Sequence, residues 1–143
     1  MRKSQIYAAW IARLAVGFVF AVNIECALAF ILQPENYAPG FEISGVAGST
    51  AVQGFGILFL MWNATYPPVI LKPDKYRLLY WIILCQSAIG VIGETWLWFE
   101  LPAGHAALAA TGMRFILFDG LGLVLMAAAF GLLSLVRAPK SQT

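Results

Sequence analysis

The sequence predicts an all-α fold, an integral membrane bundle of four helices with both termini in the cytoplasm. Of the 143 residues, 61% are hydrophobic and only 11% are charged, whereas a soluble chain of this size would need a mostly polar surface. Four continuous apolar stretches each reach the ~20 residues that cross a hydrocarbon core of ~30 Å. Membrane β-strands would alternate between apolar and polar residues, so the spans are predicted to be helices.

We expect one transmembrane domain over residues 1–143, with helices at about 7–32, 49–71, 76–99 and 106–136. The first stretch is predicted to be a retained helix, because it is too long for a signal peptide, contains Arg13 and precedes no small-residue cleavage site. The second and third helices are joined by a tight turn at Lys72 to Lys75, which predicts that they are antiparallel neighbours.

The longest connection is the outer loop at 33–48. Its prolines and glycines are expected to prevent any helix: Pro34, Pro39, Gly40, Gly45 and Gly48. Its apolar side chains fit a lid lying on the outer membrane surface, and a passive linker is the alternative.

The positions of the basic residues predict the topology. Eight of the nine Lys and Arg flank one side of the predicted bundle: Arg2, Lys3, Arg13, Lys72, Lys75, Arg77, Arg137 and Lys140. The positive-inside rule therefore places both termini and the turn at residues 72–75 in the cytoplasm. The net charge of +2 reflects this topology and does not point to a nucleic-acid partner.

Four ionisable side chains fall well inside the predicted helices: Glu25, Glu94, Arg114 and Asp119. At ~1.5 Å per residue, Glu25 and Glu94 lie roughly 8–10 Å, and Arg114 roughly 12 Å, from the outer ends of their helices. Asp119 lies near the middle of the last helix. Charged groups at membrane depth are costly, so each is a candidate functional residue.

Small and polar residues recur at helical spacing, which predicts that these side chains share inward faces. We expect a ligand-binding pocket in the outer half of the bundle, lined by Glu25, Gln53, Glu94 and Arg114. A second set is predicted to be structural: Asn23, Asn63, Gln86 and Asp119.

Within the predicted pocket, two carboxylates face a single arginine. We expect Glu94 to pair with Arg114, which leaves Glu25 as the unpaired carboxyl that carries any activity. A purely structural ion pair, with no ligand, is the open alternative.

Several cofactors are disfavoured. A haem held by two histidines is not expected, because His105 is the only histidine. Cys26, Cys85 and His105 lack the spacing of metal ligands, so no metal site is predicted. No paired nucleophile and base is evident, so the sequence favours a non-catalytic protein.

Two short motifs resemble the DoxX-like group of small bacterial membrane proteins: RLAVGF at 13–18 and RFILFDG at 114–120. The resemblance implies a bacterial inner-membrane protein that serves as an accessory subunit of quinone-linked or redox-stress complexes.

Three classes of function stay open. The first is a non-catalytic accessory subunit that binds a lipophilic ligand, either a quinone or a lipid, and contacts membrane lipids, a larger complex or further copies of itself. The second is a small proton-coupled transporter that uses a membrane carboxylate. The third is an enzyme that modifies a lipid.

Overall fold

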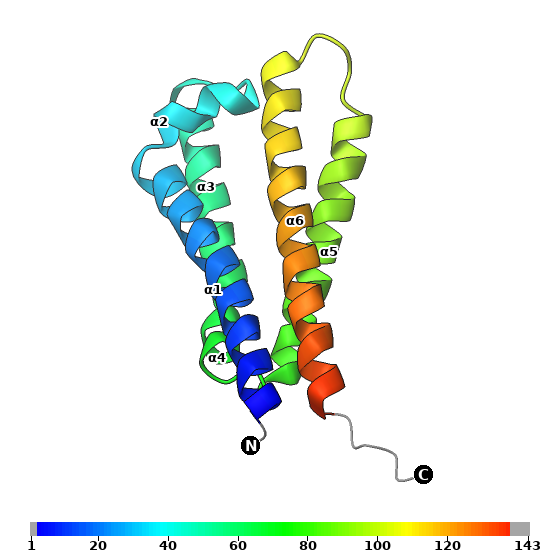
Figure 1. Cartoon of the computed structure of the whole chain (residues 1–143). Helices are drawn as coiled ribbons and strands as arrows, with labels where there is room; N and C mark the ends of the chain where they lie inside the picture. Colours follow the sequence, from blue (N-terminus) through cyan, green and yellow to red (C-terminus); the bar gives the residue numbers. More distant parts are fainter. Residues whose placement is uncertain (1–2, 138–143) are drawn as a thin grey trace.

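The computed structural model describes residues 3–137, which are almost entirely helical and contain no strand. These residues form six α-helices and one 3₁₀ helix: α1 (Lys3–Leu32), α2 (Pro34–Tyr37), η1 (Ala38–Phe41), α3 (Gly45–Asn63), α4 (Tyr66–Leu71), α5 (Arg77–Phe99) and α6 (Ala106–Arg137). Figure 1 shows their arrangement. The predicted all-α class is confirmed. Arg2 and Lys140, which contributed to the topology prediction, lie outside the described residues.

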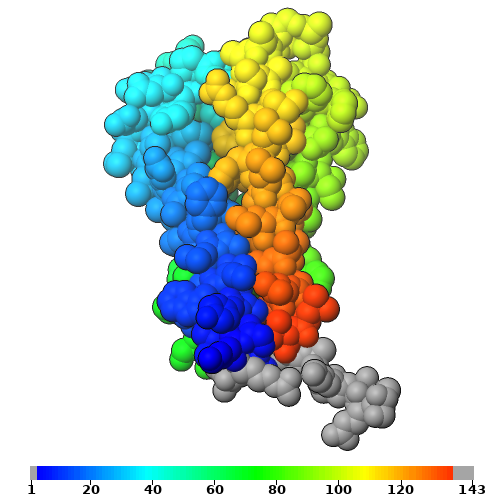
Figure 2. Space-filling model, viewed as in Figure 1, coloured from blue at the N-terminus to red at the C-terminus, as the bar shows by residue number. Residues whose placement is uncertain are grey.

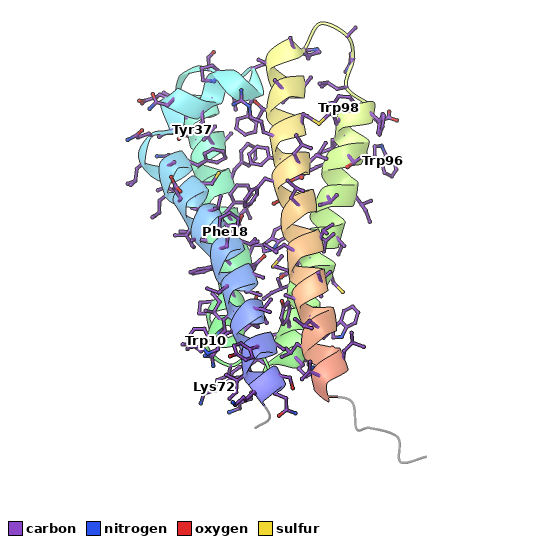
Figure 3. The ribbon with its side chains drawn as sticks, viewed as in Figure 1. Trp10, Phe18, Tyr37, Lys72, Trp96 and Trp98 are labelled. Atoms are coloured by element: carbon purple, nitrogen blue, oxygen red, sulfur yellow. The ribbon has the colours of Figure 1, made fainter. Side chains whose placement is uncertain are left out.

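Four segments of the described chain are long and apolar enough to cross a membrane: Lys3–Leu32, Gly45–Leu71, Arg77–Phe99 and Ala106–Val136. These spans are typical of a multi-pass membrane protein. Figure 3 shows Trp10 and Lys72 near the end that carries the termini, and Tyr37, Trp96 and Trp98 near the opposite end. Such belts of aromatic side chains fit the two interfaces of a bilayer. We call the end near Trp10 and Lys72 the terminal end, and the end near Tyr37, Trp96 and Trp98 the lid end.

The four spans form two helical hairpins. α1 packs against α3, α5 packs against α6, and α1 also packs against α6. In Figure 1 the two hairpins approach each other at the terminal end and spread apart toward the lid end. The second and third spans, predicted to be antiparallel neighbours, meet mainly where α4 packs beside α5, and the main partner of α3 is α1.

The second span is broken near the terminal end. The helix predicted at 49–71 begins earlier, at Gly45, and stops at Asn63, and a separate short helix then starts at Tyr66. Pro67 and Pro68 explain the break, since proline removes a backbone donor and is tolerated only in the first turn of a helix. After the break, α4 packs against α1 and also reaches α5.

The outer connection is helical in part, contrary to the prediction. Pro34 and Pro39 each lie in the first turn of a short helix, where a missing backbone donor costs little. The turn into α3 uses two residues with positive φ, Glu42 at 56° and Gly45 at 65°. We call residues 33–44 the lid, because α2 and η1 lie across the end of the first hairpin and η1 packs against α6 (Figure 1).

The largest core lies at the terminal end, where all four spans meet. It combines small side chains of α1, such as Ala12 and Val16, with larger ones from α4, α5 and α6. Figure 2 shows atoms of α1 and α6 in contact along this half of the molecule. A second, smaller core around Phe30 and Val52 lies beneath the lid.

Candidate functional site

A cavity of about 440 Å³ lies between the two hairpins and beneath the lid. It extends from lid residues such as Tyr37 and Phe41 down to Met126, at the edge of the terminal core. Every long helix contributes to its wall, and the polar or charged side chains in that wall are Asn23, Asn36, Asn63, Ser87, Glu94, Thr111, Arg114 and Asp119. Its size falls within the usual range of small-molecule sites.

Aromatic rings form the wall closest to the lid. The Phe30 ring lies 5.8 to 6.3 Å from the rings of Phe41, Phe59 and Phe115, measured between centroids. Tyr37 packs 4.9 Å from Phe30, and Figure 3 shows aromatic side chains gathered between α1 and α6 in this half. These rings come from α1, the lid, α3 and α6, so the wall depends on the lid being seated. None of them was predicted as a site residue, although phenylalanines on several spans were a visible signal.

A pair of carboxyl groups lies deeper in the cavity. Glu94 of α5 and Asp119 of α6 both line the cavity, and their side chains lie within hydrogen-bonding reach of each other. A carboxylate only accepts hydrogen bonds, so this contact requires one proton shared by the pair. Glu94 Oε2 is buried and has no hydrogen-bond partner among the described residues. The cavity therefore contains an acidic pair in which Glu94 Oε2 can accept a further hydrogen bond.

Two amides connect α1 to α3 on the opposite wall. Asn23 Nδ2 donates to Asn63 Oδ1 at 3.2 Å, and Asn63 Nδ2 donates to the carbonyl oxygen of Phe59 at 2.8 Å. Asn63 is buried, so these bonds satisfy a side chain that would be costly to leave unpaired. The structural role predicted for Asn23 and Asn63 agrees with this contact, and both residues also face the cavity.

Arg114 lies on the same wall as Asp119. The cavity-facing stripe of α6 runs through Thr111, Arg114, Phe115, Phe118 and Asp119, at the three- and four-residue spacing of one helix face. Arg114 and Asp119 are separated by roughly 140° around the helix, which places them at the two margins of this broad stripe.

The predicted pair between Glu94 and Arg114 is not formed. Across residues 3–137, Arg114 makes no salt bridge, and the partner of Glu94 is Asp119. Arg114 is exposed at the surface as well as lining the cavity, so its guanidinium can reach solvent or lipid headgroups without a carboxylate.

Glu25 lies outside the cavity. The inward stripe of α1 includes Val19, Asn23, Cys26 and Phe30, and Glu25 is exposed on another face of the helix. It is two residues beyond Asn23, a rotation of roughly 200°. Glu25 was predicted to line the pocket, but it does not line this cavity.

Two other predicted residues also lie away from the cavity lining. Gln53 is exposed, and its Nε2 donates to the carbonyl oxygen of Ile31 at 3.2 Å, which links α3 to α1. Gln86 is half-buried within α5, and its Oε1 has no partner among the described residues. Its neighbour Ser87 faces the cavity instead, together with Tyr66.

The lid is held against α6 by a carboxylate. Glu42 Oε2 lies 2.5 Å from His105 Nδ1, and Glu42 Oε1 accepts a hydrogen bond of 3.2 Å from the backbone N–H of Leu108. The hydrogen bond with His105, followed by that from Leu108, lowers the pKa of Glu42 from its ordinary value. Gly40 lies so close to α6 that a Cβ on it would be 2.9 Å from Thr111 Oγ1.

Within residues 3–137, no three His, Cys, Asp or Glu side chains lie close enough to hold a metal ion. Comparison of this chain with protein-family models, with curated proteins and with solved structures finds no match.

Proposed function

We propose that this protein binds a lipophilic ligand, a quinone or a lipid, in the lid-end cavity and acts as a non-catalytic accessory subunit. The observation that carries the proposal is the cavity of about 440 Å³, which combines an aromatic wall with a few polar groups. Ligand sites typically have mostly apolar walls and a small number of polar groups that fix orientation.

The arrangement of the lid supports the same proposal. Tyr37 and Phe41 of the lid complete the aromatic wall, and the contacts of Glu42 hold the lid on α6. A passive linker would not need to contribute side chains to the cavity. A lid that both lines and covers a cavity is the arrangement expected where a ligand enters and leaves.

Native mass spectrometry and solvent extraction of the purified protein test the proposal. Wild-type protein should carry a small amphiphile. Cys26→Trp, which fills the cavity from α1, should lose it, whereas Leu28→Trp on the exposed face of α1 should retain it. Thermal melts of both variants show whether they are folded. An empty wild-type protein, or equal occupancy in two folded variants, would contradict the proposal.

A proton-coupled transporter is the second candidate, and the Glu94–Asp119 pair favours it. A carboxyl pair that shares a proton at membrane depth can exchange that proton for a substrate. Uptake by vesicles containing the protein should then depend on a pH gradient and fail in Asp119→Asn. Uptake that is independent of the gradient would exclude this candidate. A lipid-modifying enzyme is the third candidate, and turnover that requires one of these carboxyls would favour it.

The cellular setting is also part of the proposal: a DoxX-like protein of a bacterial inner membrane, with both termini cytoplasmic, that contacts a larger complex or its own copies. Lys3, Arg13, Lys72, Lys75 and Arg77 support this topology, because the segments that contain them meet at the terminal end (Figure 1). Single cysteines at two exposed positions, Glu35 and Lys72, test it. An impermeant thiol reagent on intact cells should label only the cysteine at Glu35, and labelling at Lys72 would overturn the topology.

A further inference from the structure

The cavity contains hydrogen-bonding atoms that have no protein partner among the described residues. Donors lie at one depth along α6, and an acceptor lies at another. Toward the lid, the guanidinium of Arg114 carries donors only, and none of them has a protein partner among the described residues. About 7.5 Å further along the helix axis, Glu94 and Asp119 share one proton, and the buried Oε2 of Glu94 remains an unused acceptor. A well-matched ligand must therefore accept a hydrogen bond at one end of its head and donate one at the other.

We infer that the ligand has an uncharged, hydroxylated head, whose O–H group donates to the Glu94–Asp119 pair while a second oxygen accepts from Arg114. This inference rests on the proposed function and narrows its ligand class. Phenols and hydroquinones with an apolar tail have this chemistry, and so do acylglycerols.

Two other classes of head fit less well. A head that carries only carbonyl or ether oxygens would leave the Glu94 acceptor unpaired, which is costly in a buried site. A cationic amine could donate to the carboxyl pair, but Arg114 lines the same cavity and would repel it. A neutral hydroxyl group satisfies the acceptor without this repulsion.

The aromatic wall determines where the ligand lies. Phe30, Phe41, Phe59 and Phe115 lie on the lid side of the carboxyl pair, at a depth where a planar head or the first part of an acyl chain would contact them. An aromatic head can stack on these rings, with its hydroxyl directed toward Glu94 and Asp119.

Three compounds that share a six-carbon ring skeleton and a decyl tail test the inference: decyl-hydroquinone, its dimethyl ether and decyl-benzoquinone. Calorimetry under anaerobic conditions, with purified protein in detergent, measures their dissociation constants. We expect the hydroquinone to bind on the order of tenfold more tightly than the other two, because only it can donate to the carboxyl pair. A fourth probe, 1-decanoylglycerol, separates the two ligand sources: tighter binding than decyl-hydroquinone identifies an acylglycerol, and weaker binding a hydroxylated ring.

Variants of the carboxyl pair show whether it causes this preference. In the double variant Glu94→Gln, Asp119→Asn, the amides can donate, so the preference should shift toward decyl-benzoquinone. Asp119→Asn alone is a second variant in case the double variant does not fold, and it should reduce the preference. The control Glu25→Gln, on the exposed face of α1, should bind like the wild type.

The outcomes separate the inference from the proposed function. Equal binding of the three ring compounds, or an unchanged preference in folded Asp119→Asn, overturns the inference and leaves a lipophilic-ligand site in place. Failure of every probe to bind, together with the absence of a co-purified amphiphile, overturns both. A shift toward the benzoquinone in the double variant supports the carboxyl pair as the group that selects the hydroxyl.

Discussion

The two halves of this bundle are built from the same four spans but are packed in opposite ways. At the terminal end, α1, α4, α5 and α6 form a continuous core of buried side chains. At the lid end, the hairpins spread apart (Figure 1). The cavity between them is lined by an acidic pair, an arginine and a group of phenylalanines. Membrane helices gain little from hydrophobic burial against each other, so close packing and interhelical hydrogen bonds determine which half is tight.

Small residues and hydrogen bonds between elements close the terminal half. Ala12 and Ala15 allow α1 to approach its neighbours. Tyr80 Oη donates to the carbonyl oxygen of Met126 at 3.0 Å, and Arg77 Nη2 donates to Ser134 Oγ at 2.6 Å. Both bonds connect α5 to α6, so this half combines close packing with specific polar contacts.

Larger and charged residues keep the lid half open. On its inward face α1 has alanines in the terminal half but Phe30 in the lid half, and the lid half of α6 adds Phe115, Arg114 and Asp119. Their bulk and polarity prevent the hairpins from closing. The difference shows that the terminal half is the scaffold and the lid half is the region that is free to hold a ligand.

The largest predicted effect comes from a cavity made in the terminal core. Ile83 is fully buried, so Ile83→Ala should reduce the free energy of unfolding by about 2–4 kcal/mol. Ile92 on the same helix is 66% exposed, and Ile92→Ala should have little effect. Denaturation in detergent, followed by circular dichroism, measures both. A similar loss in the two variants would show that the terminal core is not the scaffold.

A smaller effect is expected where α1 and α3 touch beneath the lid. A Cβ on Gly56 would lie 2.7 Å from the carbonyl oxygen of Ala27, so Gly56→Ala must push the helices apart, at a cost of about 1–3 kcal/mol. Gly54 has nothing within 4 Å of its Cβ position, which makes Gly54→Ala a matched control on the same helix. Equal melting temperatures of the two variants would mean that this hairpin is not tightly packed.

The smallest effect concerns the contact between the lid and α6. The pKa of Glu42 is lowered in the folded protein. Its contacts with His105 and Leu108 therefore stabilise the lid fully at pH values above 4.5, the ordinary pKa of this carboxyl group. That contribution is lost as the pH falls through the lowered pKa. Glu42→Gln should therefore loosen the lid slightly at about pH 7 and remove the acid-dependent part of the loosening.

Hydrogen exchange of the lid amides, measured between about pH 7 and pH 3 and corrected for the intrinsic pH dependence of exchange, follows this change. Glu35→Gln is the control, because Glu35 is an exposed acid in the same segment. The same acid-dependent loosening in wild type and Glu42→Gln would show that Glu42 does not hold the lid.

The sequence was sufficient to predict the four spans, because apolar composition and length alone determine whether a helix can cross a membrane. It did not predict the break at Ala64 and Thr65, because Pro67 and Pro68 can either kink a span or start a new helix, and only packing against α5 decides between them. The lid was predicted as loop because Pro34 and Pro39 were interpreted as helix breakers and not as first-turn residues.

The candidate site was predicted in part. Glu94 and Arg114 were placed in one polar pocket, and both line the cavity. Their pairing was wrong, and Glu25 was placed on the wrong face, because periodicity gives the relative angles of residues on one helix but not the rotation of that helix about its axis. In α1 the alternative stripe through Asn23 and Cys26 faces the cavity. The role of Asp119 beside Glu94 required the relative placement of α5 and α6.

The central claim is that the Glu94–Asp119 pair contacts a ligand in the lid-end cavity. Infrared difference spectroscopy of the purified protein, with and without decyl-hydroquinone, tests it directly, since a carboxyl group that gains a hydrogen bond changes its C=O absorption. We predict that the probe shifts a protonated carboxyl band in the wild type and in Glu25→Gln, and that this shift is absent in Asp119→Asn. A wild-type band that does not respond to bound probe, or a shift that persists in Asp119→Asn, would contradict the claim.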